Sequence, residues 1–184
     1  MFSVAVLVGS LRRESINMKL ARALAKLAEP KLEFRFINIG ELPLYNDDLW
    51  QNQPDTVTAF KSAVKACDAV LLVTPEYNRG VPAVLKNAFD WGTRPPGHNV
   101  WAGKPGALAG ASAGAIGTAV VQSQLRNSLV VLQVILMGQP EIYFQFKPGV
   151  IDGAYEIADE TTRVFLSGWV DKFEAWIRRI GSNA

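Results

Sequence analysis

The sequence has one cysteine and one histidine in 184 residues. A single thiol, Cys67, excludes an intrachain disulfide and a metal site built from several thiolates. Because Cys67 lies at the end of an expected helix, just before an expected strand, we interpret it as a buried structural thiol. His98 lies in a loop rich in proline and glycine, and no GxSxG motif is present, so serine–histidine hydrolysis is disfavoured. Asp47 and Asp48 are only an adjacent pair, so we expect no metal site.

Long hydrophobic runs and a strong charge of either sign are also missing. The apolar run at 129–137 is interrupted by Gln133 and ends before Gly138, so it is too short for a membrane span. Residues 1–8 lack the basic start of a signal peptide, and a cytoplasmic location is therefore expected. The net charge is only +2. No dense basic stripe or nucleic-acid-binding motif occurs, so no nucleic-acid partner is expected.

The sequence alternates between strand-like and helix-like patterns. Unbroken apolar runs at 4–8 and 69–74 are typical of central parallel strands covered by helices on both faces. Further strands are expected at 32–39, 105–111 and 141–146. Helices are expected from residue 17, from residue 55, at 82–91, at 118–137 and at the C-terminal end. The apolar face expected for the last helix consists of Phe165, Trp169, Phe173, Trp176 and Ile180.

No internal repeat or interdomain linker interrupts this alternation, so residues 1–184 are expected to form a single domain. Five strands alternating with helices predict a three-layer α/β fold. The topology that fits is flavodoxin-like, with a five-stranded parallel sheet in the order 2-1-3-4-5. Ligands of such sheets bind beyond the carboxyl ends of the strands, where the strand order reverses between the first and third strands.

Three unusual loops follow strands at that edge: 9–17, 75–80 and the loop that begins at Ser112. The first carries two hydroxyls, two guanidiniums and an amide at the start of a helix. Free N–H groups and the positive end of the helix dipole favour a phosphate there. The alternative is an ordinary connection in which Ser15 caps the helix. A longer loop, 40–54, carries Tyr45 and Trp50, which either line a pocket or pack against the core.

Two common nucleotide-binding motifs are absent. The sequence contains no GxGxxG fingerprint and no GxxxxGK[ST] loop, which disfavours a Rossmann dehydrogenase and a P-loop nucleotidase. Gly110, Gly114 and Gly117 have the wrong spacing for the fingerprint, and they allow either close approach to a ligand or close helix packing. With so few catalytic side chains, an enzyme with this sequence would need an organic cofactor.

Three sequence elements together resemble one family. They are Gly-Ser-Leu-Arg at 9–12 followed by Ser15 and Asn17, Pro-Glu-Tyr-Asn at 75–78, and Leu-Lys-Asn-Ala-Phe-Asp-Trp at 85–91. This combination resembles the NAD(P)H-dependent FMN reductases, and within them the bacterial quinone reductases that also act as chromate reductases. The resemblance covers nearly the whole chain and implies FMN as the cofactor.

The resemblance also implies which residues hold FMN. Those expected around its phosphate are Ser10, Arg12, Ser15, Ile16 and Asn17, with Ser15 and Asn17 donating hydrogen bonds at the helix start. Those expected around the isoalloxazine ring are Pro75, Glu76, Tyr77 and Asn78, and Ser112 completes the site. Physical chemistry agrees, because a phosphate dianion needs several oriented donors. A flavin ring, in turn, needs a flat slot with a few polar groups at its rim.

The implied activity is a ping-pong reaction at the flavin. NADPH or NADH delivers a hydride and leaves, and an oxidant then takes its place. Quinones are the expected oxidants, and chromate is a further candidate. No side chain is assigned a catalytic role, because the protein supplies binding and orientation. Arg79, Arg94 and Lys104 are expected to border the cavity and attract anions, with Arg79 the best candidate for binding substrate; the alternative is that they are solvated surface charges.

Other functions stay open on the sequence alone. They are a flavodoxin-type electron carrier, an azo- or nitro-compound reductase, and a flavin-binding sensor. Flavodoxin-type carriers are typically strongly acidic, whereas this chain is slightly basic. The family that the chain resembles forms dimers and tetramers, so a homodimer or homotetramer is expected. One expected helix has an apolar face that could pack either in a subunit interface or in the chain's own core. Its residues are Val121, Leu125, Leu129 and Leu132.

Overall fold

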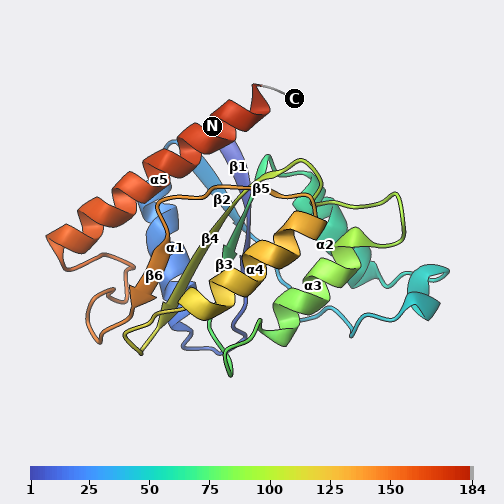
Figure 1. Cartoon of the computed structure of the whole chain (residues 1–184), viewed down its shortest axis with the longest axis horizontal. Helices are drawn as coiled ribbons and strands as arrows, with labels where there is room; N and C mark the ends of the chain where they lie inside the picture. The colour runs from blue at the N-terminus through green and yellow to red at the C-terminus, as the bar shows by residue number, and fades with distance from the viewer. Residues whose placement is uncertain (183–184) are drawn as a thin grey trace.

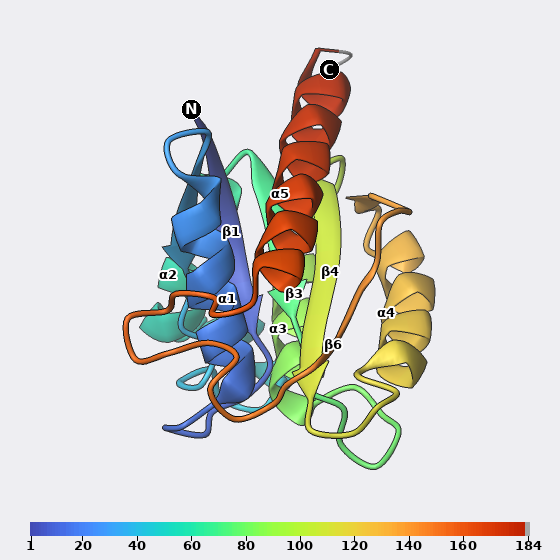
Figure 2. The same ribbon diagram turned by 90° about the vertical axis from the view of Figure 1, so that its left-hand side faces the viewer.

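The computed structural model describes residues 1–182 and shows a parallel sheet with helices on both faces (Figure 1). The strands are β1 (Phe2–Val8), β2 (Leu32–Phe36), β3 (Ala69–Val73), β4 (Pro105–Ser112), β5 (Ile135–Leu136) and β6 (Ile142–Gln145). The helices are α1 (Ile16–Ala28), α2 (Asp55–Lys65), α3 (Ala83–Thr93), α4 (Ala119–Val131) and α5 (Glu160–Gly181), with a short 3-10 helix at Asp47–Trp50. Helices α1 and α5 cover one face, and α2, α3 and α4 cover the other (Figure 2). No helix among the described residues is both long and apolar enough to cross a membrane.

The sheet order is β2-β1-β3-β4-β5, and every pairing is parallel, which confirms the expected flavodoxin-like topology. Two short strands share the fifth position, because β5 pairs with the start of β4 and β6 pairs with its end. The sheet therefore has six strands, and the sequence predicted only the second of these two, at 141–146. Strand β2 is shorter than predicted because the Asn38 side chain accepts a hydrogen bond from the Gly40 N–H at 3.0 Å and so turns the chain.

The helix predicted at 118–137 is too long. Helix α4 ends at Val131, and Gln133 adopts a left-handed φ of 64° that turns the chain back towards the sheet. Ile135 then donates its N–H to the Lys104 carbonyl at 2.9 Å. This short strand satisfies backbone groups at the open edge of β4, which a longer helix would leave unpaired.

Strand β1 is buried on both sides, as its unbroken apolar run predicted. Val4, Val6 and Val8 belong to the hydrophobic cluster under α1 and α5, whereas Ala5 and Leu7 belong to the cluster under α2, α3 and α4. Successive side chains of a strand point to opposite faces, so β1 is anchored in both clusters. The loop after β1 therefore starts from a fixed point.

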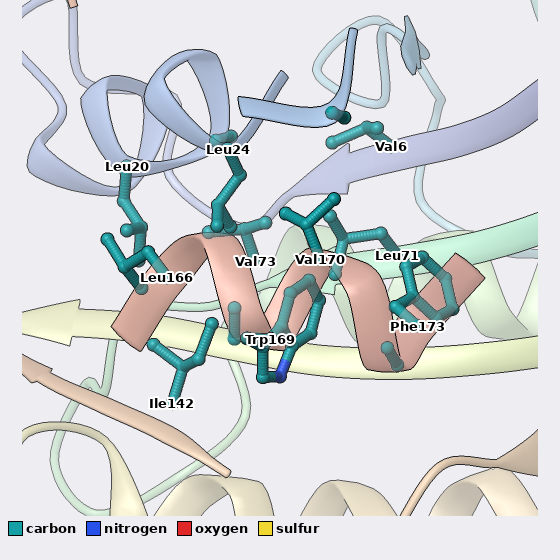
Figure 3. Packing of buried hydrophobic residues seen from close by; sticks show 14 of the residues in the cluster. Val6, Leu20, Leu24, Leu71, Val73, Ile142, Leu166, Trp169, Val170 and Phe173 are labelled. Carbon is teal, nitrogen blue, oxygen red and sulfur yellow. The ribbon is translucent and has the colours of Figure 1, made fainter. Parts of the chain in front are cut away.

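Helix α5 packs across the first of these clusters (Figure 3). Leu166, Trp169, Val170 and Phe173 are fully buried against the sheet and α1. The predicted stripe is wrong at both ends, since Phe165 is 45% exposed and Ile180 is only partly buried, whereas Leu166 and Ile177 are buried instead. The observed spacing still follows the period of one helical face.

Burial decides two alternatives that the sequence left open. The four residues of the apolar α4 face lie in the chain's own core: Val121, Leu125, Leu129 and Leu132. They are therefore not an exposed interface. Tyr45 packs edge-on against Trp91, with ring centroids 5.0 Å apart, and Trp50 is partly buried in the same cluster. The loop 40–54 thus contributes its aromatic residues to packing.

Cys67 lies between α2 and β3 and is 3% exposed, which confirms the buried thiol predicted from the sequence. Its Sγ donates to the Ala63 carbonyl at 3.4 Å. Burial raises the pKa of this thiol, so little of the reactive thiolate forms near neutral pH. The position of Cys67 therefore favours a packing role.

Candidate functional site

The loops after β1, β3 and β4 meet at the carboxyl edge of the sheet, at the lower end of the molecule in Figure 2. The Gly9 N–H donates to the Val73 carbonyl at 2.8 Å, which holds the ends of β1 and β3 together. A cavity of about 190 Å³ lies between the three loops. Its lining residues are Ser10, Arg12, Ser15, Ile16, Asn17, Pro75, Glu76, Tyr77, Ala111, Ser112 and Ala113.

This cavity brings together most of the residues that the sequence predicted for a cofactor. Every one of them lines it except Asn78. Arg79, which was predicted to bind substrate, does not line it either. Ala111 and Ala113 line the cavity but were not predicted, because alanine carries no polar group that would mark a site. Their position on either side of Ser112 was the only available signal.

Helix α1 begins in the cavity wall with its first N–H groups unpaired. Ser15 is the N-cap, and its Oγ accepts a hydrogen bond from the Met18 N–H at 3.1 Å. The Ser15 hydroxyl hydrogen stays available for another acceptor. Within residues 1–182, the backbone N–H groups of Ile16 and Asn17 have no acceptor. The helix start therefore gathers several donors at one place, as an anion site requires.

Arg12 and Arg13 add positive charge beside these donors. Both side chains are exposed, and neither forms an ion pair with any described residue. The first turn of α1 has no acidic residue. Of the two arginines, only Arg12 lines the cavity. An unpaired guanidinium next to free N–H groups attracts a dianion such as a phosphate ester.

Asn17 lines the same cavity, but its side chain already has a partner in the protein. Its Nδ2 donates to the Ala111 carbonyl at 2.9 Å, and its Oδ1 accepts from the Ala111 N–H at 2.8 Å. The residue is 2% exposed. The sequence predicted that Asn17 donates at the helix start. Its backbone N–H, rather than its side chain, is the group that lacks a partner among residues 1–182.

The loop after β3 contains a tight turn at residues 77–80. Tyr77 and Gly80 exchange two backbone hydrogen bonds, with N–O distances of 3.4 and 2.9 Å. Between them, Asn78 and Arg79 have φ angles of 52° and 63°. Positive φ at both central residues is typical of a type I′ turn. This turn places Asn78 and Arg79 outside the set of residues that line the cavity.

Glu76 fixes this loop to the start of α4. Its Oε2 accepts from the Val121 N–H at 3.1 Å, and its Oε1 accepts from Arg79 Nη1 at 3.2 Å. Gln124 Nε2 also donates to the Arg79 carbonyl, at 2.7 Å. Arg79 is 62% exposed, and its charge is paired with Glu76. It is therefore a weaker attractor for an anion than the unpaired Arg12.

Tyr77 joins two walls of the cavity. Its hydroxyl donates to Ser10 Oγ at 3.4 Å, which links the loops after β1 and β3. The Tyr77 side chain is half-exposed, so an aromatic ring stands beside the cavity and is open to a flat ligand. On the third wall, Ser112 Oγ accepts from the Gly114 N–H at 3.1 Å and orders the loop after β4.

Gly110 allows close packing of the backbone, rather than a close approach of the backbone to a ligand. A Cβ atom at this position would lie 2.1 Å from Thr118 Oγ1 and 2.5 Å from the Thr74 carbonyl oxygen. Gly117 has a φ of 63°, and a Cβ there would lie 2.7 Å from the backbone of Tyr143. Both glycines allow the backbone to pack closely around the start of α4.

Arg94 and Lys104 lie at the opposite edge of the sheet, so the expectation that they border the cavity is wrong. Arg94 is the C-cap of α3, which runs from the carboxyl edge back to the amino edge, and Lys104 directly precedes β4. Lys104 Nζ donates to the carbonyls of Cys67 and Lys65. Burial lowers the pKa of Lys104. The loop that leads into a parallel strand lies at the edge away from the ligand site.

A larger cavity, of about 660 Å³, lies at this amino edge beside the end of α5. Its charged side chains are already engaged. Asp68 accepts from Ser3, Lys104 donates to backbone carbonyls, and Arg178 pairs with Glu174. The smaller cavity has unpaired donors, so we assign the functional site there. No group of three or more His, Cys, Asp or Glu residues gathers in the described part of the chain as a metal site would need.

Several known proteins with similar sequences are quinone reductases by name. A 2-hydroxy-1,4-benzoquinone reductase of Burkholderia sp is 50% identical over 175 residues, which covers 95% of this chain and 96% of that protein. A quinone reductase of Pseudomonas putida is 46% identical over 178 residues, with 96% and 95% covered. The solved structure of FerB, a flavoenzyme NAD(P)H:(acceptor) oxidoreductase from Paracoccus denitrificans, superposes with a TM-score of 0.95. It shares 47% identity, and 97% of this chain and 98% of that chain are covered.

The profile of one protein family extends over most of the fold, from β1 to the loop after β6. It matches residues 2–149 and describes NADPH-dependent FMN reductases. This range contains all three loops of the cavity. Because this match spans most of the chain and relatives are up to 50% identical over nearly its whole length, the chain belongs to the NADPH-dependent FMN reductase family.

Proposed function

We propose that this protein is an FMN-dependent NAD(P)H oxidoreductase that reduces quinones. The observation that carries the proposal is the cavity at the start of α1, where free N–H groups, the Ser15 hydroxyl and the unpaired Arg12 converge. The names of relatives at 46% and 50% identity supply the quinone as the acceptor class. No side chain of the cavity is assigned a catalytic role.

The residues present fit FMN. Arg12, Ser15 and the N–H groups of Ile16 and Asn17 would hold the phosphate, because they supply charge and several donors. Pro75, Glu76, Tyr77 and Ser112 would surround the ring, and Asn78 would contribute from the turn. Bound FMN would supply the redox chemistry, which is acceptance of a hydride from NADPH or NADH and its passage to the oxidant. The protein's part is to bind, orient and exclude water.

The proposed order of events is ping-pong, with the nicotinamide leaving before the acceptor enters. Tyr77 is half-exposed beside the cavity, which supports one shared binding place beside this ring. The nicotinamide and the quinone, both flat, would occupy it in turn. Initial rates at several fixed quinone concentrations should give parallel double-reciprocal lines against NADPH. Intersecting lines would show that both substrates bind together and would refute the order proposed.

The test of the whole proposal is the flavin content and activity of the purified protein. We expect a yellow protein whose released flavin has the mass of FMN, and NADPH oxidation that depends on added benzoquinone. Release of FAD would refute the cofactor assignment. An FMN protein that accepts electrons from a reductase partner but not from NADPH would instead be a flavodoxin-type carrier. Rates measured with azo and nitro compounds as acceptors, compared with the rate for benzoquinone, would distinguish a quinone reductase from an azo- or nitro-compound reductase.

Chromate is part of the proposal as a second, poorer acceptor. Arg79 is the candidate for attracting it, although its ion pair with Glu76 reduces the charge it can offer. We expect a lower kcat/KM for chromate than for a quinone, and a further decrease for chromate at low salt in Arg79→Ala. Added salt should remove the difference, because screening shortens the range of the charge to about 10 Å at 0.1 M. An unchanged value for chromate would remove Arg79 from the substrate site.

The proposal also includes a homodimer or homotetramer in the cytoplasm. Val130 and Val131 at the end of α4 and Ile135 on β5 are exposed apolar residues, which supports a contact between copies. Light scattering of the purified protein would give its mass, and a 20.1 kDa species would mean a monomer. A cytoplasmic location agrees with an unpaired cysteine and is tested by cell fractionation.

A further inference from the structure

The side chain of Asn17 makes a pair of hydrogen bonds that normally belongs to a neighbouring strand. Its amide donates to the Ala111 carbonyl at 2.9 Å and accepts from the Ala111 N–H at 2.8 Å. The two residues are 94 positions apart in the sequence. One amide therefore replaces both backbone groups that an adjacent strand would have offered to Ala111.

Ala111 needs this replacement because β3 ends too early. The pairing of β3 with β4 stops at Val73 opposite Ala109, and Thr74 adds one bond from its N–H to the Ala109 carbonyl at 2.9 Å. The next residue, Pro75, has no N–H and begins the loop around the cavity. Buried backbone groups without partners are strongly disfavoured. Asn17 satisfies those of Ala111 and so allows β4 to continue to the cavity.

We propose that Asn17 is a positioning residue that sets the width of the cofactor cavity through Ala111. Its amide fixes the start of α1, with the N–H groups of Ile16 and Asn17, to the end of β4, where Ser112 begins the third wall. The wall at 111–113 and the start of α1 line the same cavity. This inference rests on the proposed FMN site. It assigns the Asn17 side chain to a contact within the protein rather than to a contact with the FMN phosphate.

Replacement of Asn17 by aspartate provides a switchable version of this contact. A protonated carboxyl group has one donor and one acceptor and can form both bonds to Ala111. A carboxylate can only accept, so it would face the Ala111 carbonyl without a hydrogen. Burial should raise the pKa of the new carboxyl, whereas the free N–H groups at the start of α1 and the nearby Arg12 should lower it, so the titration has to be followed over a wide pH range.

Other ionisable groups near Asn17 must be controlled in this experiment. Arg12, Glu76 and Tyr77 line the same cavity from the loops after β1 and β3, and Lys19 follows on α1. The facing part of β4 carries no ionisable residue. The phosphate of FMN also titrates, with a second pKa of about 6. Each variant is therefore compared with wild type at the same pH, so that these groups are common to both.

The experiment measures FMN affinity at pH 5.5 and pH 8.5, and the visible circular dichroism of bound FMN at saturation from pH 4 to pH 10. For Asn17→Ala we expect an FMN Kd about 10-fold higher at both pH values, since two hydrogen bonds are lost, and an altered flavin band. For Asn17→Asp we expect the wild-type band at the acidic end of the titration and the altered band at its basic end. The band at saturation does not depend on affinity, so repulsion between a carboxylate and the phosphate does not imitate this result.

Arg12→Ala is the matched control, because it removes a phosphate contact without touching Ala111. It should raise the Kd and leave the flavin band of the saturated protein unchanged. A wild-type band in Asn17→Ala would overturn the positioning role, and so would an Asn17→Asp band that stays unchanged, relative to wild type, over a titration of the FMN-saturated variant from pH 4 to pH 10. If Asn17→Ala does not fold, the titration of Asn17→Asp decides alone. A wild-type protein that binds no FMN would instead refute the proposed function.

Discussion

Arg12 is the residue whose removal should affect cofactor binding most directly. It lines the cavity and has no ion pair among the described residues. For Arg12→Ala we expect a loss in FMN affinity of roughly 10- to 100-fold, because a hydrogen bond to a charged group contributes about 1.5–3 kcal/mol. The hydride-transfer rate of the FMN-saturated variant should change little, since the phosphate lies away from the reacting ring. Fluorescence titration and stopped-flow reduction by NADPH measure the two quantities.

Arg13→Ala is the control for this prediction. Arg13 is also exposed and has no ion pair in the described structure, but it does not line the cavity. A general loss of positive charge would weaken both variants to the same degree. A specific phosphate contact would weaken Arg12→Ala far more. Equal Kd values for the two variants would contradict the role given to Arg12.

Most residues that line the cavity were predicted from the sequence, and their partners were not. Serine and arginine at the start of a helix favour a phosphate by local chemistry, whereas Pro75, Glu76, Tyr77 and Ser112 were predicted only through the family resemblance. The partner of Asn17 is 94 residues away, and no local pattern identifies it. Arg94 and Lys104 were misplaced although the predicted topology gives their position. The loop between the helix at 82–91 and the strand at 105–111 leads into a parallel strand and therefore lies at the amino edge.

Two strands of the sheet are tied together at the amino edge by Asp68. Its Oδ2 accepts from the Ser3 N–H at 2.7 Å and from the Ser3 hydroxyl at 2.8 Å. These hydrogen bonds, above all the one from the Ser3 backbone, lower the pKa of Asp68 from its ordinary value of 3.8. A carboxylate whose pKa is lower in the folded state stabilises the fold above its unfolded pKa. This stabilisation is lost as the pH falls through the folded pKa.

We therefore expect Asp68→Asn to be less stable than wild type at pH 7. The difference in Tm should shrink as the pH falls below about 4, because the unfolded chain then binds a proton that folded Asp68, with its lowered pKa, binds only at lower pH. Thermal unfolding followed by circular dichroism at pH 7 and pH 3 tests this. A difference in Tm that is the same at both pH values would mean that the charge of Asp68 does not contribute.

Glu76 links the loop after β3 to helix α4. It should stabilise the start of α4 as a cap that comes from another segment of the chain. Its Oε2 accepts from the Val121 N–H, one of the groups that a helix start leaves unpaired. Loss of such a cap costs about 1 kcal/mol. For a chain of this length, Glu76→Ala should lower Tm by roughly 2–4 °C. Differential scanning calorimetry of the protein without flavin gives the value.

Glu76→Gln separates the cap from the ion pair with Arg79. Glutamine retains an acceptor for the Val121 N–H but carries no charge for Arg79. We expect it to keep most of the stability that alanine loses, since exposed ion pairs contribute little. If glutamine and alanine lower Tm equally, the ion pair matters and the cap does not.

Helix and strand types were predicted well, and their ends were predicted poorly. The apolar run of β1 gave its position because both of its faces are buried. The end of α4 depends on the unpaired edge of β4, to which Ile135 adds a short strand. That requirement comes from a strand about 30 residues earlier, so the local helical pattern up to residue 137 was misleading.

Cofactor binding should stabilise the whole molecule. A ligand that binds only the folded state adds about 2.7 kcal/mol when it is present at 100 times its Kd. Since 1 kcal/mol shifts Tm by roughly 2–4 °C in a domain of this size, FMN should raise the Tm of the flavin-free protein by roughly 5–11 °C. A single transition before and after addition would also support the prediction of a single domain.

The same FMN concentration should raise the Tm of Arg12→Ala much less, because the variant is then far from saturation. Riboflavin, which lacks the phosphate, should act on wild type in the same weaker way. An equal shift for FMN and riboflavin would show that the phosphate contributes nothing to binding. That result would contradict the assignment of the start of α1 as the phosphate site.

The two ends of the described chain lie close together, far from the cavity. Phe2 and Ser182 line the same hollow at the amino edge, whereas the three cavity loops lie at the opposite end of the molecule (Figure 2). A short peptide could therefore join the ends, and new ends could be opened in a surface loop, to give a circular permutant with an intact site. Attached to an electrode or a bead through either end, the protein would hold the three cavity loops on the side away from the support.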